Sequence, residues 1–283
     1  MRPLVDALVD LDAALGGNAG LMIAGGLGLY LKQEHLRATG ARTLMPSHRL
    51  PSARTTQDVD LFLHADTIAK PDRARAVRAA LDVLDFRPVA GAEFLKFRRG
   101  TGAREVTIDL LVGPVGSQRS SIEFKGGRAR PVGISGRDAL HAYHTPEAVG
   151  VDAHWLAVDV RECAAAAQCS VRIPCAFSYV LMKLSALSDR IHDPGKGFGR
   201  HHAVDLYRII AMLSEEDERV SRECALAHSS NEVIEHVRSL AHRLFARRDG
   251  LGRTRLREGA RGLMTLSEAD ADLLYSELQR MLS

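Results

Sequence analysis

The sequence of residues 54–63 is Arg-Thr-Thr-Gln-Asp-Val-Asp-Leu-Phe-Leu, and it determines how the rest of the chain is interpreted. From Asp58 onward polar and apolar residues alternate with a period of two, which predicts a β-strand. Val59 and Leu61 then face the protein core, and Asp58 and Asp60 share the opposite face. Two neighbouring carboxylates repel each other unless cations neutralise them. We therefore expect a cation-binding site on this strand.

A magnesium ion suits such a pair, because it takes oxygen ligands and is usually bound by one or two carboxylates together with substrate phosphates. A third carboxylate, Asp109, lies in a predicted pair of strands at residues 93–98 and 105–112, opposite the apolar stripe of its strand. Three such carboxylates would hold two ions about 3.5–4 Å apart, the geometry of nucleotidyl transfer. The alternative is that Asp58 and Asp60 line a solvated strand face.

A pair of glycines, Gly25 and Gly26, lies upstream, between an apolar run at residues 21–24 and a helix-like segment at residues 29–34. A glycine turn that opens a helix presents backbone N–H groups to an anion such as phosphate. A plain tight turn is the alternative. Residues 38–56 follow and are expected to form a loop.

The hydrophobic pattern changes near Pro174, where the period of strands gives way to the period of helices. We expect a bilobal α/β (α+β) fold, with a mixed β-sheet in the N-terminal lobe and a helical C-terminal lobe. The predicted domains are residues 1–170 and 171–283. Helical stripes are predicted at residues 177–187, 206–213, 230–247 and 267–282, with an Arg- and Gly-rich stretch at 247–262 separating the last two.

Three charged residues of the helical half are candidates for the site. Lys183 and Arg190 are seven residues apart, so they lie on one side of the same predicted helix, where both would meet phosphate oxygens. The alternative for Lys183 is a lysine that extends from an apolar stripe to water. Asp205 lies in a strongly apolar helix and needs a cationic partner. Its alternative role is therefore a structural ion pair, with Lys183, Arg190 or Arg208.

Composition limits the choice of function. The 283-residue chain has a formal charge of +3, too close to neutrality for a polycation that binds nucleic acid along its whole length. Eight arginines and four acidic residues at positions 231–262 give a local excess of four positive charges. This patch predicts contact with RNA phosphates, with a solvated face or a protein-docking surface as alternatives. No apolar run approaches about 20 residues, so we expect no membrane span and a cytoplasmic protein.

Taken together, Gly25-Gly26, residues 54–61 and Ile108-Asp109-Leu110 resemble the nucleotidyltransferase fold of the DNA polymerase β superfamily. Residues 182–190 and 202–207 resemble the Lys-helix and Asp-helix motifs of AbiEii/MenT-type toxins, which belong to type IV-like toxin–antitoxin systems. The likeness extends roughly over residues 20–213. The chain departs from the commonest superfamily signature, which has Gly-Ser where Gly26 stands, so a hydroxyl contact to phosphate is missing.

The resemblance implies an enzyme that transfers a nucleoside monophosphate from an NTP to an acceptor, the 3′ end of tRNA, and that is restrained by an antitoxin. The helical lobe would close the nucleotide cleft. The cofactor would be Mg²⁺ or Mn²⁺, held by Asp58 and Asp60, with Asp109 as a third ligand by analogy with the wider superfamily. Asp205 would have a catalytic or site-organising role. The nucleotide would be bound by Gly25, Gly26, Arg54, Thr56, Lys183 and Arg190.

Two other functions fit the same residues. A nucleotidyltransferase that modifies a small molecule, such as an antibiotic, would use the same acids without needing the arginine patch. A nucleotide-binding or interaction protein with a decayed site would keep the fold without the chemistry.

Overall fold

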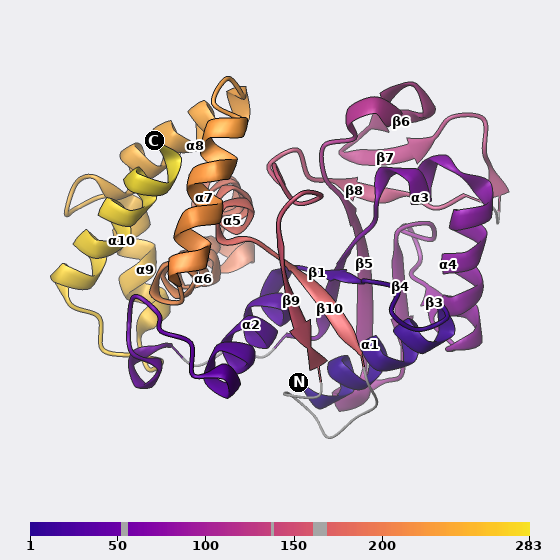
Figure 1. The fold of residues 1–283 in the computed structure, drawn as a ribbon, viewed down its shortest axis with the longest axis horizontal. Helices are drawn as coiled ribbons and strands as arrows, with labels where there is room; N and C mark the ends of the chain where they lie inside the picture. Colours follow the sequence, from indigo (N-terminus) through magenta and orange to yellow (C-terminus); the bar gives the residue numbers. More distant parts are fainter. Residues whose placement is uncertain (52–55, 137–138, 161–168) are drawn as a thin grey trace. The chain divides into compact units, whose positions relative to one another are not determined.

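The computed structural model describes residues 1–51, 56–136, 139–160 and 169–283 (Figure 1). The chain forms two compact units, and both are discontinuous in sequence. The predicted α/β (α+β) class is confirmed, with a mixed sheet in unit 1 and helices in unit 2. Unit 1 comprises Met1–Ala38, Arg54–Pro146 and Trp155–Pro174, and unit 2 comprises Thr39–Ala53, Glu147–His154 and Cys175–Ser283.

The sheet of unit 1 has the strand order β6-β7-β8-β5-β2-β1-β10-β9, and β4 pairs with both β3 and β5. Parallel and antiparallel neighbours are mixed: β2 runs parallel to β5, whereas β1 and β4 are antiparallel to β2 and β5 respectively. The strands are β1 (Met22–Ile23), β2 (Asp58–Phe62), β3 (Arg87–Pro88), β4 (Lys96–Arg99), β5 (Val106–Val112), β6 (Ile122–Lys125), β7 (Arg128–Pro131), β8 (Ala142–His144), β9 (Trp155–Asp159) and β10 (Ser170–Pro174).

The core of unit 1 lies on one face of this sheet. Val59, Ile108 and Leu110 are fully or almost fully buried there, as the alternation of β2 and β5 predicts. Helix α1 (Arg2–Ala14) packs against β5 and against α4 (Pro71–Val83) and buries its own leucines. Asp58, Asp60 and Asp109 project to the opposite face of β2 and β5. The remaining helices of the unit are α2 (Gly25–Thr39) and α3 (Ala65–Ala69).

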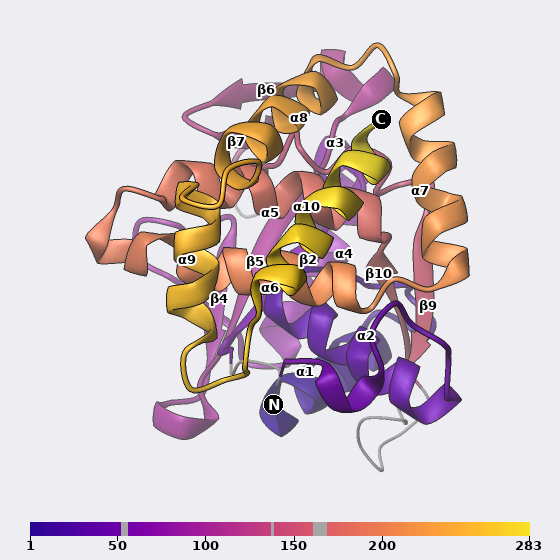
Figure 2. The same ribbon diagram turned by 90° about the vertical axis from the view of Figure 1, so that its left-hand side faces the viewer.

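Unit 2 is a bundle in which α5 packs against α6, α7 and α8, and α6 packs against α9. Helices α8 and α10 lie side by side (Figure 2). None of the helices in the described ranges is long and apolar enough to cross a membrane. The helices are α5 (Ala176–Arg190), α6 (Arg200–Ala211), α7 (Glu215–Ala227), α8 (Glu232–Phe245), α9 (Leu251–Ala260) and α10 (Glu268–Leu282), and short 3₁₀ helices occur at Ser47–Arg49, Gly102–Arg104, Gly116–Ser121 and Pro194–Gly199.

Two short segments of the first half of the chain belong to unit 2, although the predicted domain boundary assigned them to the first lobe. Residues 39–51 are attached to α6: the backbone N–H of Met45 donates to the carbonyl of Ala211 at 3.0 Å, and the hydroxyl of Tyr207 contacts the Met45 sulfur at 3.0 Å. Residues 147–154 are attached to α5, where the Ser178 hydroxyl donates to the carbonyl of Val149 at 2.6 Å.

Two helices of unit 2 were not predicted. Helix α7 follows the predicted stripe at residues 206–213, and α9 occupies the Arg- and Gly-rich stretch that we expected to separate two helices. Helix α7 begins with a capping box, in which Ser214 and Asp217 satisfy each other's backbone N–H groups. Helix α9 buries Leu256 and Ala260, too few apolar residues to give a clear periodic signal.

Candidate functional site

The start of α2 lies against the carboxylate of Asp60. Antiparallel pairing of β1 with β2 aligns Ile23 with Leu61, and the next N–H, of Ala24, donates to the Asp60 carbonyl at 2.9 Å. The chain then turns into α2 at Gly25, whose φ is +62°. A Cβ atom on Gly25 would lie 1.7 Å from an Asp60 carboxylate oxygen. The turn therefore requires glycine for its conformation and for the space that Asp60 occupies.

The acids of unit 1 share one face of the sheet. Parallel pairing of β2 with β5 aligns Asp60 with Asp109 and Asp58 with Thr107. Residues aligned on neighbouring strands project to the same face, about 4.8 Å apart. Asp58 is exposed, and Asp60 and Asp109 are half-buried. The structure thus brings the three predicted metal-binding acids to one face, beside the N-terminus of α2.

Lys96 on β4 completes this face and was not among the predicted site residues. It is aligned with Asp109, and its Nζ lies 3.1 Å from a carboxylate oxygen of Asp109. Burial raises the pKa of Asp109, with the negative charges of Asp60 and Asp58 acting in the same direction and the Lys96 ammonium acting against them. Burial alone would lower the pKa of Lys96, but Asp109 and Asp58 raise it overall. Lys96 is therefore a fixed positive charge among the acids.

A signal for Lys96 is present in the sequence. Within the predicted strand at residues 93–98, Leu95 and Phe97 share one face, so Lys96 between them faces the other way. The sequence does not specify which residue of β5 stands opposite Lys96. That register comes from pairing between strands, which local alternation leaves open.

The oxygen atoms of Asp58 and Asp60 are suitable ligands for Mg²⁺ or Mn²⁺, because both ions favour carboxylate oxygens. Within the described ranges, no group of three or more His, Cys, Asp or Glu side chains is arranged to hold a metal ion. The three acids on this face therefore do not form a ready-made cage of three protein ligands. Two carboxylates together with substrate phosphates remain a normal magnesium site.

The predicted nucleotide-binding residues of unit 1 have different surroundings. Gly26 is buried in the first turn of α2, next to Gly25. The Thr56 hydroxyl accepts from the Asp58 N–H at 3.3 Å, so it is occupied in shaping the start of β2. Arg54 lies outside the described residues.

The predicted residues of unit 2 form a buried ion cluster. Lys183 on α5 donates to Asp205 on α6 at 2.7 Å, and Arg208 lies 3.4 Å from the other carboxylate oxygen of Asp205. The side chains of Lys183 and Asp205 are 8% and 1% exposed. Such deep burial is typical of a structural ion pair, which was the alternative role predicted for Asp205. Arg190 lies nearby in sequence and contacts His202 of α6.

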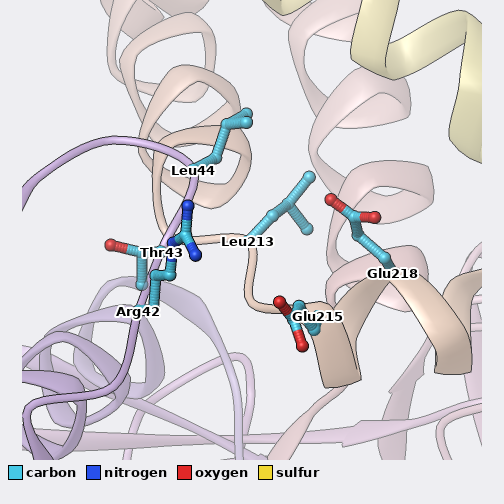
Figure 3. Close-up of a pocket in the computed structure, with 6 residues that line it drawn as sticks. All are labelled: Arg42, Thr43, Leu44, Leu213, Glu215 and Glu218. Atoms are coloured by element: carbon cyan, nitrogen blue, oxygen red, sulfur yellow. The ribbon is translucent and has the colours of Figure 1, made fainter.

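A pocket of about 340 Å³ lies within unit 2, between residues 42–44 and the junction of α6 with α7 (Figure 3). It contains none of the predicted site residues. Two carboxylates face a single arginine in it, and one of them, Glu218, pairs with Arg280 at 3.1 Å. This charge balance disfavours a triphosphate. The lining residues are Arg42, Thr43, Leu44, Leu213, Glu215 and Glu218.

In the arginine patch at residues 231–262, several guanidinium groups have protein partners, so fewer are available to RNA phosphates than the sequence suggests. Arg253 is buried, and it donates to the Phe245 carbonyl and pairs with Asp272. Arg257 pairs with Glu268. Both carboxylates lie on α10, outside the stretch used to count the local charge. Other members with protein partners are Arg238, with the Leu282 carbonyl, Arg247, with Asp249, and Arg255, with Glu258.

Comparison of the chain with models of protein families, with curated proteins and with solved structures gave no significant match. The chemistry of the site is therefore argued from its geometry and from the resemblance of its motifs to those of nucleotidyltransferases.

The contact between Gly25 and Asp60 can be tested by substitution. We expect Gly25→Ala to lower the free energy of unfolding by roughly 1–3 kcal/mol more than Gly40→Ala, because the added Cβ displaces the Asp60 carboxylate. Gly40 is the matched control: its φ is +65°, and a Cβ there meets nothing within 4 Å. Urea denaturation of both variants measures the difference. Equal losses would show that Gly25 is needed only for its backbone conformation.

The buried cluster of unit 2 gives a second prediction. Asp205→Asn leaves Lys183 and Arg208 buried without a counter-charge, so we expect a loss of about 3–5 kcal/mol in the free energy of unfolding. The control is Asp66→Asn, which breaks a Lys70–Asp66 pair of the same 2.7 Å length in which Lys70 is 53% exposed. That loss should be much smaller, because solvent screens the pair. Equally small losses for the two variants would contradict a structural role for Asp205.

Proposed function

We propose that this chain is a metal-dependent nucleotidyltransferase, which moves a nucleoside monophosphate from an NTP to an acceptor hydroxyl and releases pyrophosphate. The observation that supports this most directly is the packing of Asp60 against Gly25. This contact joins an acidic strand, which favours a cation, to the N-terminus of a helix, which favours an anion. A magnesium–triphosphate complex needs both: carboxylates for the cation and a helix N-terminus for the phosphates.

The donor atoms fit the proposed cofactor. Asp58 is exposed and Asp60 is half-buried, so both carboxylates lie at the surface of unit 1 on the same face of β2. Carboxylate oxygens are hard ligands, as Mg²⁺ and Mn²⁺ require. A bound divalent cation would neutralise phosphate charge and lower the pKa of an attacking hydroxyl.

The protein's own residues would bind and orient the substrate. The 15-residue helix α2 begins at Gly25, and its N-terminal partial positive charge favours the triphosphate. Packing against the Gly25 backbone limits the positions that the Asp60 carboxylate can take, so its orientation is set before substrate arrives. Such prior positioning is how most phosphoryl-transfer enzymes lower the barrier.

The resemblance gives Lys183, Arg190 and Asp205 parts in nucleotide binding or catalysis. The ion pair of Lys183 with Asp205 supports a different contribution, in which they hold α5 and α6 together within unit 2. The proposed chemistry is therefore assigned to the acids of unit 1. The acceptor is proposed from the resemblance alone: the 3′ end of tRNA, in a toxin whose activity an antitoxin restrains.

The direct test incubates the protein with each α-labelled NTP, Mg²⁺ and total tRNA. We expect label on tRNA with the native protein, and a fall of at least about 100-fold for Asp58→Asn and Asp60→Asn, because each removes a ligand of the cation. Asp72→Asn is the matched control. It removes the same charge from a side chain that is 91% exposed on α4, and it should keep full activity.

Each other result has a separate meaning. Label on a small molecule but not on RNA would support the transferase and contradict the tRNA acceptor. Absence of label and of released pyrophosphate with every NTP would contradict the enzyme and favour a binding protein.

A further inference from the structure

A row of three charged residues crosses the polar face of unit 1. Strand pairing aligns Asp60 on β2 with Asp109 on β5, and Asp109 with Lys96 on β4. Asp109 is the middle member, so it has a carboxylate on one side and an ammonium on the other. The carboxylate is that of Asp60, on a strand whose backbone lies about 4.8 Å from that of β5. The ammonium is that of Lys96, in an ion pair of 3.1 Å.

The position of Lys96 is set by the fold of β4. Its neighbour Phe97 is fully buried on the opposite face, which commits Lys96 to the face of the acids. The Lys96 and Asp109 side chains are 31% and 16% exposed, so solvent screens their attraction less than that of a surface pair. Lys96 also interacts electrostatically with Asp58. The ammonium is thus a permanent part of the acidic face.

A second cation of β4 is paired with a carboxylate of its own. Arg98, two residues along β4, lies 3.8 Å from Glu105. Asp58, Asp60, Asp109 and Lys96 together carry a formal charge of −2. One divalent cation balances this charge. A second divalent ion beside Asp109 would have to displace the Lys96 ammonium or bind within a few ångströms of it, at a Coulomb cost.

We propose that Lys96 replaces a second metal ion, so that this site holds one divalent cation on Asp58 and Asp60 while Asp109 is held by Lys96. The inference rests on the proposed function, because it concerns the metal site of that reaction. It gives Asp109 a different role from the metal ligand that the sequence and the resemblance predicted. Lys96 is a positioning residue: it keeps Asp109 away from the cation and leaves the Asp58–Asp60 pair to bind it.

The proposal predicts the number of ions bound. Native protein is titrated with Mn²⁺, and the electron paramagnetic resonance signal of free Mn²⁺ gives the bound amount. We expect one Mn²⁺ per chain, displaced by Mg²⁺, in both the native protein and Asp109→Asn. Asp60→Asn should weaken binding by at least about 10-fold, because it removes a ligand.

Lys96 itself is tested by two variants. In Lys96→Met the ammonium is gone and Asp109 stands uncompensated beside Asp60, so we expect a second Mn²⁺ to bind. Lys96→Arg keeps the positive charge and should bind one. If Lys96→Met does not fold, as judged by circular dichroism, Asp109→Asn decides alone. Two Mn²⁺ ions on the native protein, with one lost in Asp109→Asn, would overturn the proposal.

Nucleotidyl transfer is measured on the same samples, which separates the two proposals. One bound Mn²⁺ with no transfer to any acceptor would contradict the proposed function and leave the assignment of Lys96 intact. Transfer accompanied by two bound Mn²⁺ ions would contradict the assignment of Lys96 and leave the function intact.

Discussion

The contact between the Gly25 backbone and the Asp60 carboxylate is the constraint on which the candidate site depends. A side chain on residue 25 would fill the space of that carboxylate, and the positive φ of the turn is costly for any residue except glycine. The contact joins the start of α2 to the middle of β2. The pairing of β2 with β5, and of β5 with β4, then places Asp109 and Lys96 in line with Asp60.

The two sets of predicted residues differ in how their charges are balanced. In unit 1 the acids are exposed or half-buried, and one lysine offsets part of their charge. In unit 2 Asp205 is almost completely buried between Lys183 and Arg208. Burying three ionised groups is costly unless each is paired, so that cluster suits a structural role. An excess of negative charge at a surface suits the binding of a cation.

Local periodicity predicted most of the elements, because β2, β5 and α5 each place apolar residues on one face. It did not predict the parts of the chain that are stabilised by contacts with residues distant in sequence. Helix α9 gains stability from Arg253, which pairs with Asp272 on α10, and the segment around Met45 joins unit 2 through α6. In the site, the acids were predicted from the sequence, whereas the pairing of Lys96 with Asp109 was not. That pairing arises from the register between β4 and β5.

The most direct test of this account is a crystal structure with Mn²⁺ and a non-hydrolysable NTP analogue, with the metal located by anomalous scattering. We expect one anomalous peak at about 2.0–2.3 Å from carboxylate oxygens of Asp58 and Asp60, with Lys96 still bound to Asp109 and the triphosphate at the N-terminus of α2. A metal peak elsewhere, or a triphosphate bound away from Gly25, would contradict it.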